Sequence, residues 1–494
     1  MGLEMTGSRV LATFFGSSIY VWGAIISVFL AALAVGYYVG GMVADRRPDF
    51  NVLIYLLLFD GIWLLLIPIY ANRICRTILA LGPGQRLGPL LSTLLLFGGP
   101  SVLLGMVSPF AVRLAARAVH QMGNVSGSLY ALSTLGSIAG TLITAFWLVP
   151  AIGVRAILQL LGICLLILPL LVVISLRRKL WFGLIAVTMS IAGLAASRAS
   201  QTPTSDRKIV YEADSAYHHI LVVDDAQRKT RFLQFNNYVE GGIELDPPYE
   251  TRVSYSNAFQ LARIFKQKID NILIIGGGGG IVARKFITDD PSVVVDHVEL
   301  DPRVVEVSHR FFHFETGPRL RVHVEDGRNF IRRTTERYDV VILDAFTIGG
   351  QIPFHLTTRE FLTEVQQVLK PEGVLLANLN GSIQGSRSAI LNSEYKTLAS
   401  VFDNVYLFPH LMTAERGGSP TPDLYRTRNL ILVATEGERL TNEMVRTRAV
   451  ELKNSGRVTS PTFIEDASIL METGPLQRYP IFTDDYAPVD VLAF

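Results

Sequence analysis

The chain has 494 residues, of which 49% are hydrophobic, and its formal net charge at pH 7 is +2. This small net charge, with no interleaving of basic and aromatic residues, gives no case for nucleic-acid binding. The two cysteines, Cys75 and Cys164, fall in or beside apolar segments, and the second half of the chain has none, which fits a reducing compartment.

Apolar residues are concentrated in the first two hundred positions. Six segments there are each about long enough to cross roughly 30 Å of hydrocarbon as a helix. They cover residues 20–43, 52–70, 90–110, 125–150, 154–175 and 180–196. Small residues that let helices approach closely in a bilayer recur in them. These are Gly36, Gly40, Gly41, Gly136 and Gly140. We therefore expect a multi-span transmembrane helical domain over residues 1–197.

The segment before the first span, residues 1–16, mixes polar and apolar side chains and has no basic n-region or cleavage site. It is therefore not a signal peptide, and it is either the tail of a truncated first helix or an interfacial segment. The Lys and Arg residues of the short loops are nearly balanced between the two sides, so the positive-inside rule does not decide the orientation.

The composition changes after Ala196. Residues 198–208 form a short polar linker, and an alternating, strand-like pattern begins at Ile209. Strands expected at 209–211, 219–223, 231–235 and 238–240 make a small antiparallel sheet within residues 209–250. Helices are expected at 251–267, 302–312 and 358–369, inside an α/β domain over residues 251–494.

Four strand ends in this second domain carry glycines or acids. The apolar run Asn271–Ile275 leads into the glycine turn, which consists of Gly276, Gly277, Gly278, Gly279 and Gly280. The next three strands end at Glu299-Leu300-Asp301, at Asp326-Gly327 and at Asp344. Such a series describes a nucleoside pocket along the carboxyl edge of a doubly wound, Rossmann-like sheet. An acid after the second strand is placed to accept hydrogen bonds from ribose hydroxyls. The histidines lack metal-ligand spacing, so no metal is expected.

Several motifs of the second half resemble those of the spermidine synthase family of aminopropyltransferases. The stretch Ser215–Val222 resembles "Ser-x-Tyr-Gln-x-Ile-x-Val", and Ile275–Gly280 resembles "Ile-Gly-Gly-Gly-Asp-Gly". Val298–Asp301 resembles "Val-Glu-Ile-Asp", and Tyr338–Asp344 resembles "Tyr-Asp-Val-Ile-Ile-x-Asp". The apolar first half and the ending Phe482–Pro488 look like the bacterial membrane-fused branch of that family.

The sequence departs from the family pattern at the acids that would handle the amine. Gly279 stands where the glycine loop of the family has Asp, and Thr347 stands where the loop after Asp344 has its proton-accepting Asp. Glu240 replaces the strand glutamine that contacts the nucleoside. An amine is protonated at pH 7 and must lose a proton before it attacks, usually to a carboxylate. The acids that could compensate are Glu240, Glu244, Asp246, Glu250, Asp484 and Asp485.

The resemblance implies a role for each motif residue. The glycine turn, Glu299 and Asp301 would hold the ribose side, Asp326 and Gly327 the adenine, and Asp344 would lie near the sulfonium, with Tyr217 also on the donor side. The catalytic candidates are Asp344, Thr347, Tyr255 and Glu240. His355, on the loop after Asp344, is a further candidate for the acceptor side. The co-substrate would be decarboxylated S-adenosylmethionine or S-adenosylmethionine, because the loss of an anion at Gly279 relieves repulsion with the carboxylate of the latter.

Three functions follow from these observations. The first is a membrane-anchored transferase that moves an aminopropyl group to an amine acceptor. The second is an S-adenosylmethionine-dependent transferase acting on a lipid or other membrane-borne acceptor. The third is a non-catalytic nucleoside-binding sensor or transporter. A transporter would be expected to have ionisable residues within its spans, and Asp60 is nearly the only acid there, which weakens this alternative. Because the donor is cytoplasmic, we expect a multi-pass protein of the cell inner membrane with a cytoplasmic α/β domain. The expected partners are the lipid bilayer, the acceptor and a second copy of the chain.

Overall fold

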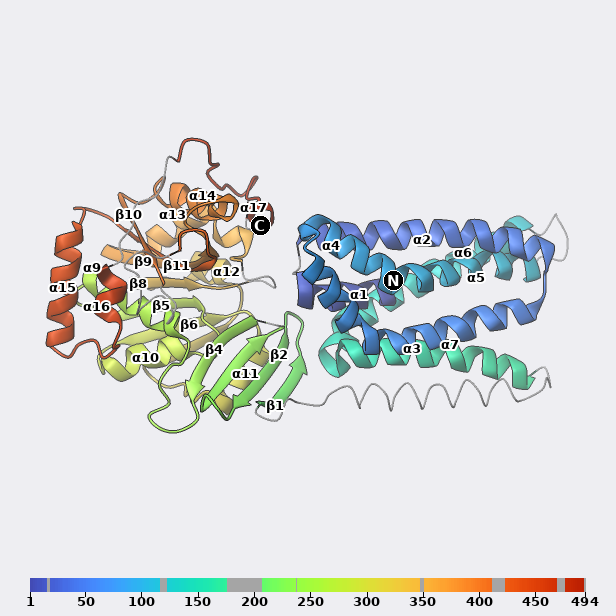
Figure 1. Cartoon of the computed structure of the whole chain (residues 1–494), viewed down its shortest axis with the longest axis horizontal. Coiled ribbons are helices and arrows are strands. Elements are labelled where there is room, and N and C mark those ends of the chain that lie inside the picture. Colours follow the sequence, from blue (N-terminus) through green and yellow to red (C-terminus); the bar gives the residue numbers. More distant parts are fainter. Residues whose placement is uncertain are drawn as a thin grey trace. The chain divides into compact units, whose positions relative to one another are not determined.

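The computed structural model describes residues 1–15, 18–115, 122–175, 207–236, 238–346, 351–410, 423–468 and 476–492. The chain divides into two compact units. The first comprises Met1–Thr204 with Ala213–His219, and the second comprises Ser205–Glu212 with Ile220–Phe494. The first unit is helical and the second is an α/β unit (Figure 1).

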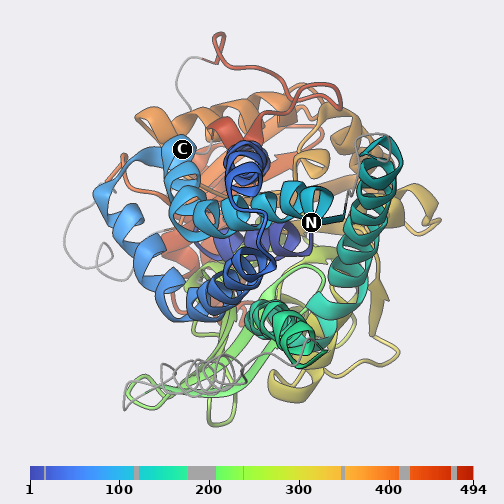
Figure 2. The ribbon, with the colours of Figure 1, turned by 90° about the vertical axis from the view of Figure 1, so that its right-hand side faces the viewer.

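Among the described residues, the helical unit contains five helices that are long and apolar enough to cross a membrane. These cover Ile19–Arg46, Phe50–Leu81, Arg86–Ala115, Gly123–Leu148 and Ala151–Pro169. They correspond to the first five expected spans, and the sixth, 180–196, lies outside the described residues. The elements are α1 (Gly2–Phe15), α2 (Ile19–Arg46), α3 (Phe50–Leu81), α4 (Gly84–Thr93), η1 (Leu94–Gly98), α5 (Gly99–Ala115), α6 (Met122–Ile143), η3 (Thr144–Leu148) and α7 (Val149–Ser175). Figure 2 looks along several of these helices.

Close helix contacts in this unit depend on glycine, as expected for some of the predicted positions. A Cβ atom on Gly36 of α2 would overlap the Val102 carbonyl oxygen of α5, and one on Gly40 would lie 2.6 Å from the Met106 Cα. The prediction is wrong for Gly41 and Gly136, where a Cβ atom would meet no described atom within 4 Å. Composition indicates that glycines pack helices together, but only the helix face decides which glycines do so.

A four-stranded sheet opens the α/β unit. Its strands are β1 (Arg207–Asp214), β2 (His219–Asp225), β3 (Thr230–Phe235) and β4 (Tyr238–Glu244), in the spatial order of the sequence. β3 pairs antiparallel with β2 and with β4, which confirms the small sheet that the alternating pattern predicted. Ile220, Val222 and Leu233 of this sheet pack against Val304 and Val307 of α11.

The second sheet has seven strands in the order β10-β11-β9-β8-β5-β6-β7. The five strands from β9 to β7 are parallel, and β11 and β10 add an antiparallel edge. The strands are β5 (Asn271–Gly276), β6 (Val294–Glu299), β7 (Leu320–Val324), β8 (Tyr338–Asp344), β9 (Leu369–Gly381), β10 (Asn404–Pro409) and β11 (Arg428–Thr435). This is the expected Rossmann-like architecture behind a small antiparallel sheet.

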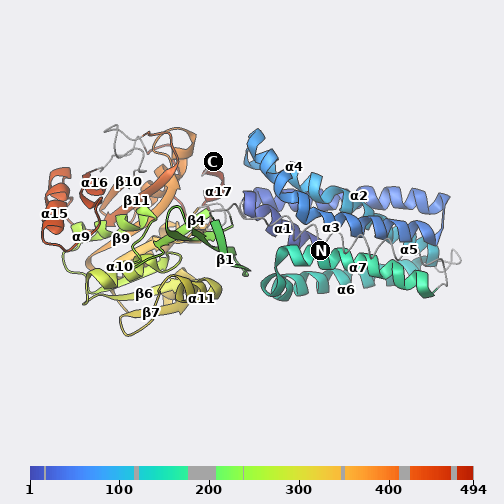
Figure 3. The ribbon, with the colours of Figure 1, turned by 60° about the horizontal axis from the view of Figure 1, so that its bottom comes forward.

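Alternate residues of the central strands face two separate cores. Ile272 and Ile274 belong to one core, and Leu273 and Ile275 belong to the other. This alternation is the period of two that a strand imposes. Helices cover both faces, and α15 and α16 lie side by side at one edge of the unit (Figures 1 and 3). The helical elements are η4 (Ser254–Leu261), α9 (Ala262–Phe265), α10 (Ile281–Asp289), α11 (Pro302–Phe311), α12 (Gly327–Arg333), η5 (Phe354–Leu356), α13 (Arg359–Val368), η6 (Ser386–Ser388), α14 (Ala389–Leu398), α15 (Asn442–Asn454), α16 (Phe463–Ser468) and α17 (Val489–Leu492).

Two of the three helices expected here are confirmed, at α11 and α13, with bounds within one or two residues. The third expectation, a helix over 251–267, is wrong in type. A 3-10 helix, η4, runs over Ser254–Leu261, and only Ala262–Phe265 is α-helical. Tyr255, Phe259 and Leu261 are all buried in the core, so packing holds this segment in a tighter helix than its sequence pattern predicts.

Candidate active site

The glycine turn joins β5 to α10 and lies directly against the end of β8. Gly276 pairs with Asp344 across the parallel strands, and the Gly277 N–H donates to the Asp344 carbonyl oxygen at 2.9 Å. Gly276 has φ 78°, and a Cβ atom there would lie 2.5 Å from the same oxygen. Both the left-handed backbone and the close approach require glycine at this position. The turn therefore brings the ends of β5 and β8 together, as a nucleoside pocket requires.

Glu240 lines one small cavity next to this turn, and Asp344 lies near enough to Glu240 for the charge of Glu240 to act on it. The cavity has a volume of about 160 Å³ and is lined by Tyr238, Val239, Glu240, Tyr255, Phe346, Asn380 and Asn429. Asp344 is 5% exposed and accepts a hydrogen bond from Asn378 Nδ2 at 2.8 Å. The Tyr255 hydroxyl donates to the Glu240 carbonyl oxygen at 2.9 Å. Three of the four predicted catalytic residues, Asp344, Tyr255 and Glu240, therefore lie together, and the fourth, Thr347, falls outside the described residues.

Burial raises the pKa of both carboxyl groups at this cavity. The pKa of Asp344 rises to about 8, because burial outweighs the hydrogen bond from Asn378 and repulsion from Glu240 adds to it. Burial alone raises the pKa of Glu240 to about 7. Burial also raises the pKa of Tyr255, and the negative charges of Asp344 and Glu240 add to that effect. Groups with perturbed pKa values are frequent at functional sites, so these carboxyl groups make this the candidate active site.

Glu299 and Asp301 occupy the end of β6 with different roles. Glu299 is 8% exposed, and its Oε1 accepts from the Asp301 N–H at 2.9 Å. Burial raises its pKa to about 7. Asp301 is the N-cap of α11 and accepts from the Arg303 N–H at 2.9 Å. The capping bond gives the Asp301 carboxylate a structural task, whereas Glu299 is placed at the carboxyl edge as expected for a ribose-binding acid.

Asp326 is the N-cap of α12 and also bonds to His355. Its Oδ1 accepts from the Asn329 N–H at 3.0 Å, and its Oδ2 lies 2.9 Å from His355 Nε2. Burial opposes its ionisation, but these two hydrogen bonds outweigh burial and lower the pKa of Asp326. His355 is thus bonded to the acid predicted for the adenine side, although we expected it to reach the acceptor. A Cβ atom on Gly327 would overlap Ile275, so this position also requires glycine.

The segment that carries Asp484 is tied to the same region. The buried Arg328 guanidinium donates two hydrogen bonds to Asp484, at 2.7 and 2.9 Å, and two to Glu364, both at 2.9 Å. Arg328 also donates to the His355 carbonyl oxygen at 3.2 Å. Asp484, considered as an acceptor-side acid, is therefore part of a network that supports His355 and, through it, Asp326.

Gly279 and Tyr217, which the motifs placed on the donor side, have other surroundings in the structure. A Cβ atom on Gly279 would lie 3.5–3.6 Å from Leu233, Ile281 and Phe312, so this position faces apolar side chains. Tyr217 lies in the turn between β1 and β2, is 38% exposed, and does not line the cavity.

Sequence reasoning missed a row of amides that reaches the cavity. Asn378 donates to Asp344, and Asn429 Nδ2 donates in turn to Asn378 Oδ1 at 3.1 Å. Asn380, two residues along β9, lines the cavity with Asn429. These residues come from strands far from the glycine turn in sequence. Their only signal was the polar Asn378 and Asn380 inside an otherwise apolar strand.

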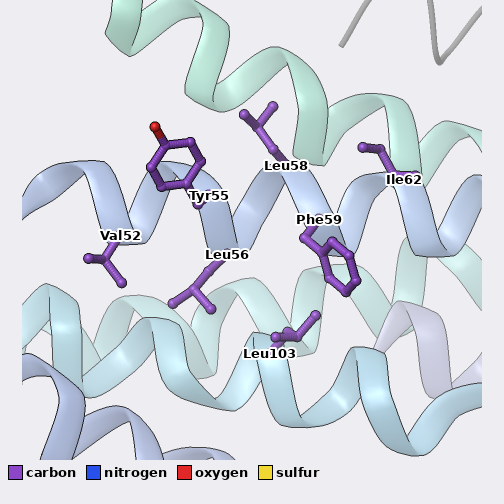
Figure 4. A pocket seen from close by; sticks show the side chains of 7 residues that line it. All are labelled: Val52, Tyr55, Leu56, Leu58, Phe59, Ile62 and Leu103. Carbon is purple, nitrogen blue, oxygen red and sulfur yellow. The ribbon is translucent and has the colours of Figure 1, made fainter. Parts of the chain in front are cut away.

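The helical unit contains two larger cavities, and their linings are apolar and aromatic where that of the first cavity is partly polar. One, of about 470 Å³, is lined by apolar and aromatic side chains of α3 and α5 (Figure 4). The other, of about 420 Å³, shares Phe59 and Ile62 with it. Neither offers a carboxylate. Within the part of the chain that the structure describes, no group of three His, Cys, Asp or Glu side chains could hold a metal ion.

Comparison with known proteins places the second half of the chain among aminopropyltransferases. Residues 257–413 match the family described as "Spermine/spermidine synthase domain". The polyamine aminopropyltransferase of Vibrio vulnificus is 36% identical over 208 residues, which are 40% of this chain and 67% of that one. A probable polyamine aminopropyl transferase of Bifidobacterium longum is 26% identical over 336 residues, 66% and 71% of the two chains. The eEF1A lysine and N-terminal methyltransferase of Bos taurus is 33% identical over 147 residues, 28% of this chain and 20% of that one.

Proposed function

Since this chain belongs to the spermine/spermidine synthase family of polyamine aminopropyltransferases, we propose that it is a membrane-anchored aminopropyltransferase that uses decarboxylated S-adenosylmethionine and an amine acceptor. The observation that carries this proposal is a pair of neighbouring carboxyl groups beside the glycine turn, the buried Asp344 and the half-buried Glu240 that lines the cavity. The donor of such a reaction carries a cationic sulfonium, and the acceptor nitrogen arrives as an ammonium group that must lose a proton before it attacks.

The donor side of the pocket supports an adenosyl group. The glycine turn leaves room for the nucleoside, and Glu299 lies at the next strand end to accept the ribose hydroxyls. Asp326, with its lowered pKa, is the acid assigned to the adenine amino group. Asp344 is assigned to the sulfonium, whose positive charge would stabilise the ionised carboxylate in a buried position.

The acceptor side supports a proton transfer to Glu240. The acceptor nitrogen must lose a proton, and its lone pair then forms a bond to the donor carbon attached to sulfur. The carbon–sulfur bond breaks, its electron pair stays on sulfur, and the sulfonium leaves as the neutral thioether methylthioadenosine. A carboxyl group with a pKa of about 7 accepts a proton efficiently near neutral pH, so Glu240 is assigned the task of the acid that Thr347 replaces.

The second candidate is methyl transfer from S-adenosylmethionine to a membrane-borne acceptor. The similarity to the bovine methyltransferase and the five long apolar helices favour it. The position of Gly279 bears on the choice of donor. A Cβ atom there would lie 3.5–3.6 Å from Leu233, Ile281 and Phe312, and the backbone is left-handed with φ 63°, which disfavours any side chain at this position. The backbone conformation therefore gives Gly279 a structural reason, and the family resemblance makes the decarboxylated donor the first choice.

Calorimetric titration of the detergent-solubilised full chain tests the proposal. We expect tight binding of decarboxylated S-adenosylmethionine and methylthioadenosine and weaker binding of S-adenosylmethionine. Release of methylthioadenosine on addition of an amine would then identify aminopropyl transfer. A preference for S-adenosylmethionine, with S-adenosylhomocysteine as the product, would favour the methyltransferase. If no adenosyl compound bound, both enzyme functions would be excluded.

A further inference from the structure

The two carboxyl oxygens of Asp344 have different surroundings. Oδ1 accepts a hydrogen bond from Asn378 Nδ2 at 2.8 Å. Oδ2 lies on the side of the glycine turn, where a Cβ atom on Gly277 would be 3.9 Å from it. The inference drawn from this difference rests on the proposed function, which assigns Asp344 to the sulfonium of the donor. We propose that Asn378 is a positioning residue that keeps the acidic proton of Asp344 on Oδ2 and, once that proton is released, leaves Oδ2 for the sulfonium.

The pairing of three strands brings two amides to Asp344. Leu343 of β8 pairs with Ala377 of β9. The residues that follow them, Asp344 and Asn378, therefore lie at the same level of adjacent strands. β9 pairs antiparallel with β11, which places Asn429 diagonally opposite Asn378. Asn378 is fully buried, and a buried amide is costly unless it is hydrogen-bonded, so these partners account for an amide inside an apolar strand.

The second amide fixes which end of Asn378 faces the carboxyl group. Asn429 Nδ2 donates to Asn378 Oδ1 at 3.1 Å, so the nitrogen of Asn378 is turned toward Asp344. If the Asn378 amide were rotated by half a turn, its oxygen would face Asp344 and would favour the protonated carboxyl group. That rotation would also place the N–H groups of Asn378 and Asn429 against each other. The amide pair, Asn378 and Asn429, therefore presents a donor to Asp344.

The direction of this hydrogen bond decides where the proton of Asp344 lies. An oxygen that accepts an N–H group does not also direct a proton at the same donor, so the neutral carboxyl group carries its proton on Oδ2. In the ionised form, the N–H group of Asn378 stabilises the negative charge. Burial raises the pKa of Asp344, and the hydrogen bond from Asn378 opposes this effect. Asn378 thus favours the ionised form that a bound sulfonium requires.

Two ligands that differ in charge test this inference. Methylthioadenosine is a neutral thioether, and its S-methylated form carries the same nucleoside with a sulfonium. Their affinities for the full chain in detergent are measured by calorimetric titration. In Asn378→Leu, we expect the affinity for the sulfonium to fall about tenfold at pH 7, roughly the effect of one hydrogen bond to a charged group, and the affinity for methylthioadenosine to stay unchanged. The pH above which the sulfonium affinity levels off should move upward from about 8, the pKa of Asp344 in the unaltered protein.

Three further variants separate positioning from packing. Asn404→Leu makes the same change at a buried position of β10, where the amide donates to the Gly437 carbonyl oxygen, and it should alter neither affinity. Asn429→Leu would allow the Asn378 amide to rotate and should weaken binding of the sulfonium alone, by a smaller factor. This variant serves as the test if Asn378→Leu does not fold. In an Asp344→Asn background, Asn378→Leu should no longer change the ratio of the two affinities.

The two ligands also separate failure of this inference from failure of the proposed function. Size-exclusion chromatography establishes that each variant is folded. An equal loss of affinity for both ligands in folded Asn378→Leu, or no loss for either, would overturn the inference and leave adenosyl binding intact. If the unaltered protein bound neither ligand, the proposed function would fail, and the inference with it.

Discussion

At the scale of single residues, the burial of two carboxyl groups determines their protonation in the empty site. Asp344 is buried and Glu240 is half-buried, and neither has a cationic partner among the hydrogen bonds of the described residues. Burial therefore favours the protonated form of each, and a cationic substrate would favour the ionised form. Two predictions follow from this balance, one for the rate and one for stability.

Replacement of Glu240 by Gln is expected to lower kcat by about 10²–10⁴-fold, the range for loss of a general base. The pKa of Glu240 is raised to about 7. Only the ionised form accepts a proton, so the rate of the unaltered protein should rise with pH up to about 7 and then level off. This rise should be absent from the variant. Single-turnover rates between pH 5.5 and 9 provide the measurement. An unaltered pH profile in Glu240→Gln would assign the base to another residue.

Replacement of Asp344 by Asn should stabilise the empty protein and weaken donor binding. The folded-state pKa of Asp344, about 8, exceeds its usual value, so the folded state holds its proton more tightly than the unfolded state. Stability is then lost as pH rises from about 4 to about 8, and each pKa unit corresponds to about 1.4 kcal/mol. The side-chain oxygen of the substituted amide would still accept the hydrogen bond from Asn378. We expect a higher thermal midpoint than the unaltered protein at pH 9 and a small difference at pH 5.

At the scale of elements, the carboxyl-terminal segment supports the donor pocket at a distance from the donor. Asp484 accepts a hydrogen bond from Arg328, and Arg328 also donates to the His355 carbonyl oxygen. The His355 ring is hydrogen-bonded to Asp326. Asp484→Ala should therefore weaken methylthioadenosine binding several-fold, and His355→Ala by about tenfold, the loss of roughly one good hydrogen bond. Asp485→Ala changes the exposed neighbouring acid and serves as the control. Equal affinities for all three variants and the unaltered protein would show that the network has only a structural task.

The packing of α2 on α5 gives a second prediction at this scale. A side chain at Gly36 would overlap the backbone of α5, whereas the space around Gly41 contains no described atom within 4 Å. Gly36→Leu should force the helices apart and lower the thermal stability of the helical unit in detergent by several degrees or more. Gly41→Leu adds the same side chain to the same helix and should be tolerated. Thermal aggregation followed by size-exclusion chromatography distinguishes the two.

At the scale of the whole molecule, the proposed cytoplasmic location of the α/β unit can be tested by labelling. Lys268 precedes β5, and its side chain is 84% exposed. In a background of Cys164→Ser, with Cys75 buried, Lys268→Cys would be the accessible thiol among the described residues. We expect a membrane-impermeant maleimide to label it only after the inner membrane is permeabilised. Labelling of intact spheroplasts would place the unit on the opposite side.

The architecture could be predicted because its signals are local. The run from Asn271 to Gly280 and the acids Glu299, Asp326 and Asp344 mark strand ends, and the parallel pairing of β5, β6 and β8 then brings them to one edge. The acceptor side could not be predicted in the same way. Asn378 and Asn429 meet because β11 pairs antiparallel with β9, a pairing between residues about fifty positions apart that no local pattern encodes.

In the proposed reaction, the sulfonium of the donor would lie near Asp344, which burial keeps protonated in the empty protein below a pH of about 8. Binding of the donor would therefore release the proton of Asp344, and the resulting carboxylate would offset the charge of the sulfonium. Donor affinity should then fall by up to tenfold for each pH unit below about 8, the pKa of Asp344 in the empty protein. Isothermal titration in buffers of different ionisation enthalpy would count the protons released.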